Sequence, residues 1–156
     1  MINKSFYSLI LCILLIGCTS KEEPSKDQNM TKAIPNKTIT LNQLEEMFAE
    51  ITESTDWDMT KPMLWGYFFT HHEPGKLESA KAILVERGYT FIDIDLSDKE
   101  NPTDPDLWWL HVEKAEVHTP QSLDKRNNEF YLLADELGLD SYDGMDVGLI
   151  ENINEL

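Results

Sequence analysis

The sequence predicts an α+β domain with a single antiparallel sheet, and three observations support this fold class. Apolar residues recur at helical spacing in three separate stretches. Aromatic and β-branched residues fill four shorter stretches, two of which alternate between apolar and polar positions. Glycine and proline separate the stretches, as they do at the ends of helices and strands. A chain of 156 residues is expected to form one folded domain.

The first helix is predicted to begin at Thr40. Thr40 and Gln43 have the spacing of a capping box, and the apolar stripe that follows continues to Ile51. After a polar loop, residues 63–70 are rich in aromatics and have apolar residues on both alternating faces. That pattern indicates a central strand covered on at least one side.

The second helix is predicted from Pro74 to Arg87. Pro74 suits the first helical position, and Gly88 suits the position just after the helix. Residues 89–96 then alternate cleanly, with isoleucine and leucine on one face and two aspartates on the other. A loop rich in acids and prolines leads to a further alternating strand at 107–118, so the two strands are expected to form a hairpin.

The last helix is predicted to begin at Thr119 and Pro120, which repeat the cap-and-proline start, and to end at Gly138. The last strand is predicted at 142–150. After the first helix, the order is therefore strand, helix, strand, strand, helix, strand. With right-handed crossovers this βαββαβ order builds the ferredoxin-like sandwich, a four-stranded antiparallel sheet with helices on one face. The extra helix precedes it.

The net charge of −16 excludes nucleic acid as a direct ligand. The chain has 29 acidic and 13 basic residues, and such a surface repels a phosphate backbone. A basic protein partner fits this charge better. We therefore expect an unknown, basic protein partner.

Residues 1–17 are predicted to be a lipoprotein signal peptide. They carry one lysine and an apolar run too short to span a bilayer, and the run ends in "LLIGC", which resembles the lipobox of bacterial lipoproteins. Cys18 is then the expected site of lipidation. The polar segment 18–38 is expected to be a flexible linker, and 39–156 the folded domain. These features predict a cell-envelope lipoprotein held by its lipid anchor, in the outer membrane facing the periplasm.

Neither a cofactor nor a metal ion is expected. Cys12 leaves with the signal peptide and Cys18 carries lipid, so the domain has no cysteine for a disulfide or for zinc. His71 and His72 are neighbours at a strand end, and we expect their side chains to point to opposite faces rather than to share an ion. The sequence contains no nucleophile elbow, phosphate-binding loop or zinc-protease motif.

The candidate binding surface combines strand residues with the paired histidines. Trp109 lies on the strand face opposite Trp108 and is the tryptophan expected to be exposed, and Asp93 and Asp95 share one face of the preceding strand. His71 and His72 complete this group.

Three stretches together resemble the regulator of ribonuclease E activity B (RraB) family. They are "WGYFFTHHEPGKLESAKAILVERGY", "LWWLHVEKAEVHTP" and "LADELGLDSYDGMDVG". The similarity covers Leu41 to Gly148, with Met145 where members often have tryptophan. It implies a ferredoxin-like domain that binds proteins through an acidic surface, and it adds Tyr142 and Asp143 to the candidate surface.

The expected localisation conflicts with the function in the family's name, since an exported lipoprotein does not meet a cytoplasmic ribonuclease. We therefore expect a membrane-anchored regulatory binding domain that is not an enzyme and has another target. Two alternatives remain: an immunity-type lipoprotein that neutralises a basic toxin, and a metal-dependent envelope enzyme that uses His71 and His72.

Overall fold

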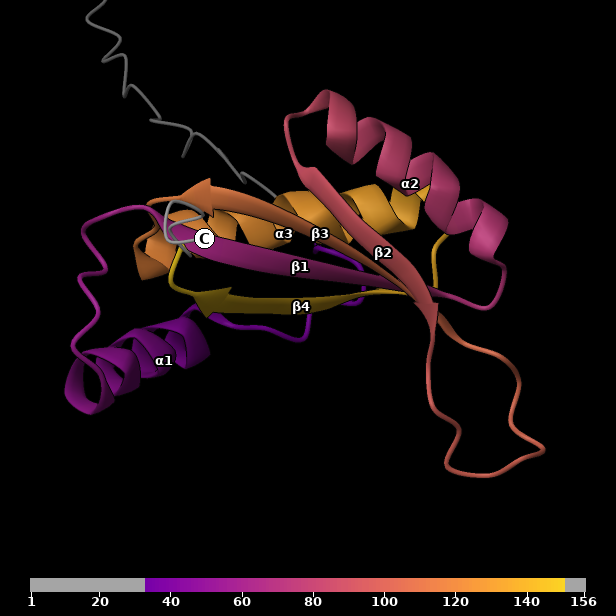
Figure 1. Cartoon of the computed structure of the whole chain (residues 1–156), viewed down its shortest axis with the longest axis horizontal. Helices are drawn as coiled ribbons and strands as arrows, with labels where there is room; N and C mark the ends of the chain where they lie inside the picture. Colours follow the sequence, from indigo (N-terminus) through magenta and orange to yellow (C-terminus); the bar gives the residue numbers. More distant parts are fainter. Residues whose placement is uncertain (1–32, 151–156) are drawn as a thin grey trace, which may run out of the picture. The chain divides into compact units, whose positions relative to one another are not determined.

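The computed structural model describes residues 33–150. The predicted signal peptide, the lipidation site Cys18 and most of the predicted linker lie outside the described residues. The elements follow the order α1 (Leu41–Ser54), β1 (Met63–His71), α2 (Pro74–Glu86), β2 (Thr90–Leu96), β3 (Trp108–Glu116), α3 (Pro120–Leu137) and β4 (Ser141–Gly148) (Figure 1). None of the helices within 33–150 is long and apolar enough to cross a membrane.

The four strands form one sheet in the order β2-β3-β1-β4, and every neighbouring pair is antiparallel. This confirms the predicted α+β class, and the strand order is that of a ferredoxin-like sandwich. β1 is central because it pairs with both β3 and β4. Two irregularities interrupt the pairing, one between Phe68 and Phe69 opposite β4, and one between Phe91 and Asp93 in β2.

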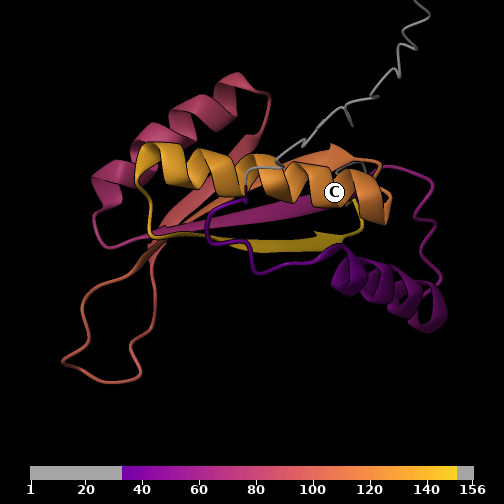
Figure 2. The ribbon, with the colours of Figure 1, turned by 180° about the vertical axis from the view of Figure 1, so that it is seen from behind.

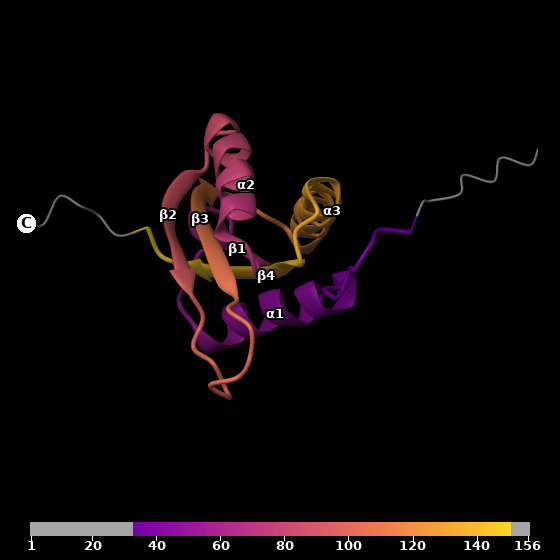
Figure 3. The ribbon, with the colours of Figure 1, turned by 90° about the vertical axis from the view of Figure 1, so that its right-hand side faces the viewer.

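Helices α2 and α3 lie on the same side of the sheet, and α1 lies beside α3 and β4 (Figures 2 and 3). Every second side chain of β1 faces the helices. Trp65, Tyr67 and Phe69 occupy these positions and are fully buried. Phe130 of α3 packs edge-on against Tyr67 and Phe69, with ring centroids 4.9 and 5.3 Å away. Aromatic side chains of this size bury the area that a small domain needs.

The helix starts follow the capping signals in the sequence. The side chains of Thr40 and Thr119 each accept a hydrogen bond from the backbone N–H three residues on, and their own backbone N–H groups donate to the side chain of that residue, so both helices have capping boxes. Gly138 ends α3 in the left-handed conformation, with φ of 63°, which a glycine adopts without strain. The predicted helix ends are correct to within three residues.

The segment before α1 contacts α3. Lys37 Nζ pairs with Asp124 Oδ1 at 2.6 Å, and the hydroxyl of Tyr131 accepts from the backbone N–H of Ile39 at 3.1 Å. Lys37, which the sequence predicts to lie in the linker, therefore packs with the folded domain. At the other end, β4 stops at Gly148 rather than continuing to residue 150.

Candidate functional site

The sheet has one face without helices, and this face is the candidate site. Because the helices cover the side of Trp65, Tyr67 and Phe69, the intervening side chains of β1 point to the opposite side. No helix of the described chain lies on that side (Figure 3). We define the open face by the aromatic and ionisable side chains that the strand register places there: Phe68, Asp93, Asp95, Trp109, His111, Glu113 and Asp146.

Three rings form the centre of the open face. The rings of Phe68 and His111 are stacked, with centroids 4.5 Å apart and planes at 23°, and Trp109 meets Phe68 edge-on at 6.2 Å. All three residues are half-buried, although no helix covers them. Rings of this kind offer flat apolar area and π surface, which suit an apolar side chain or a cation.

Carboxylates surround these rings on three strands. Asp93 pairs in register with His111, and Asp95 pairs with Trp109, so both aspartates of β2 border the ring cluster. Glu113 Oε1 lies 3.5 Å from His111 Nε2. Because the site is acidic and aromatic at once, its chemistry favours a cationic ligand with an apolar or planar part.

Gly66 allows the strands of the open face to approach closely. Its backbone N–H donates to Asp146 Oδ1 at 3.1 Å. A Cβ atom at this position would lie 2.3 Å from Asp146 Oδ1 and 2.9 Å from His111 Nε2. His111 Nε2 is enclosed without a hydrogen-bond partner in the structure. Glycine at position 66 therefore leaves the space that the side chains of Asp146 and His111 occupy on the open face.

The paired histidines lie at a different place, where β1 ends. His71 Nδ1 and His72 Nε2 are 3.2 and 3.7 Å from the same oxygen, Asp140 Oδ2, which also accepts the backbone N–H of His72 at 2.8 Å. The expectation that the two rings point apart is wrong, because His72 follows the strand rather than belonging to it. Within residues 33–150, no group of three or more His, Cys, Asp or Glu side chains is placed to hold a metal ion.

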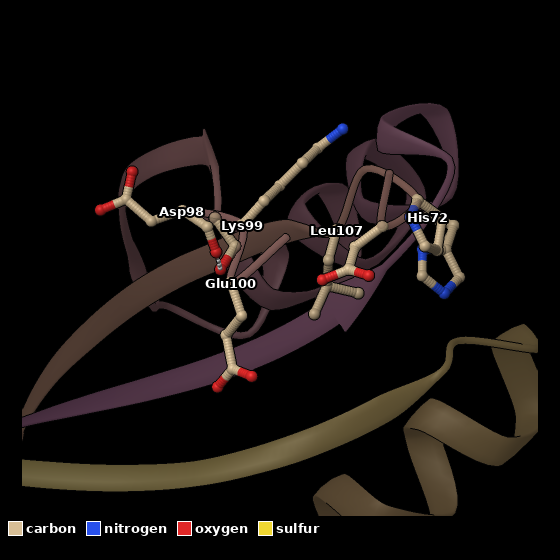
Figure 4. Close-up of a pocket in the computed structure, with 8 residues that line it drawn as sticks. His72, Asp98, Lys99, Glu100 and Leu107 are labelled. Carbon is tan, nitrogen blue, oxygen red and sulfur yellow. Dashed lines mark hydrogen bonds between the residues drawn. The ribbon is translucent and has the colours of Figure 1, made fainter. Parts of the chain in front are cut away.

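A cavity of about 250 Å³ lies at the β2–β3 loop next to His72 (Figure 4). Most of its lining residues are of polar type, although much of the surface they present is apolar, and they come mainly from the loop: His72, Ser97, Asp98, Lys99, Glu100, Asp104, Pro105 and Leu107. The carboxylates of Asp98 and Glu100 point in different directions (Figure 4). Lys99 instead pairs with Asp106, at 2.6 Å. These side chains do not converge on one point as the groups of an active site do.

A buried polar network joins the helices to the sheet on the covered side. Glu116 Oε2 accepts from Arg126 Nη1 at 2.6 Å and from the Tyr67 hydroxyl at 3.3 Å, and His118 Nε2 lies 3.2 Å from that hydroxyl. Arg126 also donates to the Tyr89 hydroxyl. These groups bond to one another across β1, β3 and α3, so the network holds the helix layer to the sheet.

The surroundings of this network shift the pKa values of Glu116, Tyr89 and Tyr67. Burial by itself would raise the pKa of Glu116, but hydrogen bonds from His118 and Arg126 outweigh it and lower the pKa to about 2. Burial raises the pKa of Tyr89 to about 12 and that of Tyr67 further, so both hydroxyls keep their protons. Glu116 is therefore an anion between protonated tyrosines and Arg126 at physiological pH.

The residues that the sequence predicts to form one binding surface lie at different places in the structure. Trp109, Asp93 and Asp95 lie together on the open face. Asp143 is exposed, whereas Tyr142 is only 2% exposed and donates its hydroxyl to Asn127 Oδ1 at 2.8 Å within the core.

Two ring residues of the open face, Phe68 and His111, were not singled out. The signal that identified Trp109, its place on the strand face opposite a core residue, applies equally to both.

These features define a small α+β sandwich domain whose uncovered sheet face is aromatic and acidic. The chain belongs to the regulator of ribonuclease activity B (RraB) family, since the model of that family matches residues 41–147. The matched range begins with α1 and ends in β4, so it contains the whole sheet apart from Gly148. The family is one of regulators, and this confirms the resemblance seen in the sequence. A search of curated proteins finds no match.

Proposed function

We propose that this chain is a non-catalytic regulatory domain that binds a basic segment of another protein on the open face. The observation that carries the proposal is the cluster of Phe68, Trp109 and His111, which is left without a helix over it and is bordered by carboxylates. Aromatic side chains are frequent anchors of protein interfaces, and complementary charge speeds and directs encounter. The net charge of −16 favours a basic partner in the same way.

The family's name suggests how such binding regulates. A protein segment that binds RNA does so with lysine and arginine against the phosphates. The carboxylates of the open face offer the same segment an alternative anionic partner. Binding here would occupy the basic segment and keep it from its nucleic acid.

The test is capture of a partner by the full chain from a detergent extract of the cell envelope. Trp109→Ala and Asp95→Asn are expected to lose the partner, because one removes the central ring and the other a bordering charge. Asp135→Asn is the matched control, an exposed aspartate on α3 on the covered side. The captured protein is expected to carry a basic segment and to elute as salt screens the charges. Equal recovery by all variants would overturn the assignment of this face.

We propose further that lipid on Cys18 holds the domain at the cell envelope, in the outer membrane facing the periplasm. The support is the sequence "LLIGC" after a short apolar run. The partner would then be an envelope protein rather than a cytoplasmic ribonuclease. Labelled palmitate is expected on the wild-type chain and absent from Cys18→Ser. A chain that takes up no label and remains in the cytosol would contradict the lipid anchor, and a cytoplasmic ribonuclease would then be the expected partner.

A further inference from the structure

The strand β2 forms an uncovered edge of the sheet. In the order β2-β3-β1-β4, only β2 and β4 have a free side. The segment before α1 runs beside β4, where Ile39 Cδ1 lies 3.3 Å from the Cβ position of Gly144 (Figure 2). No segment of the described chain pairs with the outer side of β2 (Figure 3). An open edge with unpaired N–H and C=O groups is a template for another strand.

This edge strand also exposes three apolar side chains. Phe91, Ile92 and Leu96 have exposed fractions of 39%, 41% and 46%. All three belong to a strand of seven residues. Proteins normally protect such an edge with lysine, proline, other charges or a β-bulge; β2 has no lysine or proline, and of these devices it has two aspartates and the irregularity between Phe91 and Asp93. An apolar edge left open in this way is typical of a site that another chain covers.

The backbone amides of β2 are directed so that an added strand could bond to them. Ser97 N–H donates to Leu107 O at 2.8 Å, so Ser97 points its backbone toward β3. Bonding direction alternates along an antiparallel strand. The amides of Leu96 and Ile94 therefore point away from β3, toward the free side.

The side chains of β2 specify the chemistry of the added strand. Asp93 and Asp95 lie on the open face, whereas Ile94 pairs with buried Leu110 and faces the helices. A complementary strand thus has basic residues at alternate positions, beside the aspartates, and apolar residues between them. Trp109 pairs with Asp95 on the neighbouring strand, so its ring is available to the same cation.

A second copy of this chain does not satisfy that pattern. If two β2 strands paired antiparallel about Ile94, Asp93 of each would lie opposite Asp95 of the other. Like charges directly opposite each other destabilise a strand pair. Two chains of net charge −16 would also repel each other.

We propose that β2 accepts an extended segment of the partner protein as a fifth strand, with arginine or lysine alternating with apolar residues. This inference rests on the proposed function, because the basic side chains of the added strand are those that bind the open face. It adds the binding mode, which is pairing of main chains along an edge. Affinity then depends on the backbone of the partner as well as on its charges.

The test measures binding of a fluorescent peptide that alternates arginine and valine to the full chain. Two N-methylated forms of the peptide are compared, each methylated on alternate amides in one of the two possible frames. One frame blocks the amides that face β2, and the other blocks those that face solvent. Strand addition predicts that the first loses affinity at least about tenfold and the second keeps it, since a net hydrogen bond contributes about 1 kcal/mol and several are lost.

A protein variant provides the matching evidence. Leu96→Pro removes an N–H that points to the free side and leaves the bonds to β3 in place, as proline at a sheet edge does. It is expected to weaken binding by about fivefold relative to Leu96→Ala, which loses the same side chain but keeps the amide. Circular dichroism and a urea midpoint check that both variants fold.

The outcomes separate the two proposals. Equal affinity of both methylated peptides, with binding still lost in Trp109→Ala, would overturn strand addition and leave the open face as the binding site. No binding of any alternating peptide at low salt would overturn both. A peptide of the same composition with its arginines in one block and its valines in another is expected to bind weakly, and equal binding would also count against the edge.

Discussion

Arg126 on α3 donates to Glu116 at the end of β3 over 2.6 Å, and this charge-assisted bond ties the helix layer to the sheet. Both side chains are mostly buried, with exposed fractions of 20% and 15%. Hydrogen bonds between charged groups are stronger than neutral ones, and leaving one partner alone is costly. The pair therefore makes stability depend on pH.

Stability is expected to fall in acid through Glu116. Its pKa is about 2 in the folded protein and 4.5 in the reference state, so the carboxylate stabilises the fold above the unfolded value. This contribution is lost as pH falls from about 4.5 toward about 2. Urea unfolding should show the wild type losing about 2 kcal/mol more than Glu116→Gln between neutral pH and about pH 3. Glu53→Gln, an exposed control on α1, should follow the wild type.

Alanine at two glycine positions is expected to have opposite effects. At Gly66 a Cβ atom displaces Asp146 and His111, so Gly66→Ala should lower the free energy of unfolding by about 1 to 2 kcal/mol. At Gly75, in the first turn of α2, no atom lies within 4 Å of the added Cβ. Gly75→Ala should raise it by about 0.5 kcal/mol. Two changes of the same sign in a denaturant titration would contradict this reading of the open face.

The start of α3 depends on the hydroxyl of Thr119. Its Oγ1 accepts the backbone N–H of Ser122 at 3.2 Å, and Ser122 Oγ accepts the N–H of Thr119 at 2.8 Å. Thr119→Ala should cost about 1 kcal/mol of stability, whereas Thr119→Ser keeps the cap and should cost much less. Chemical denaturation of both variants measures the difference. Equal losses would show that the methyl group of Thr119 matters rather than its hydroxyl.

Two tryptophans on opposite faces of the sheet should behave differently. Trp65 is fully buried and donates its ring N–H to Glu116 O at 3.2 Å, so Trp65→Ala should destabilise by about 3 to 5 kcal/mol. Trp109 is half-buried on the open face. Trp109→Ala should cost about 1 kcal/mol but weaken binding of a basic peptide by about tenfold or more. A large loss of stability in Trp109→Ala would make this ring part of the core.

The fold could be predicted because its signals are local. Thr40, Thr119 and Gly138 mark helix ends with residues whose own chemistry caps a helix. The alternation in β3, and in β2 from Asp93 onward, fixes which side chains face the helices, and the handedness of the crossovers fixes the strand order. Each step uses residues close together in the chain.

The site could be predicted only in part, because several of its features depend on distant residues. The bond between Glu116 and Arg126 and the shared contact of His71 and His72 with Asp140 require the strands and helices to be placed first. The irregular pairing beside Asp143 sets which residues of β4 face the core, and Tyr142 is one of them. No spacing in the sequence reveals that shift.

The order of strands also determines when the sheet can close. β1 is the first strand to be made, yet it lies between β3 and β4, and β4 is the last. Until residues 141–148 have emerged from the ribosome, the edge of β1 that pairs with β4 has no neighbouring strand. The aromatic side chains of β1 are then only partly enclosed. A chain that terminates early would thus display a ready template for aggregation, and synthesis of the final strand removes it.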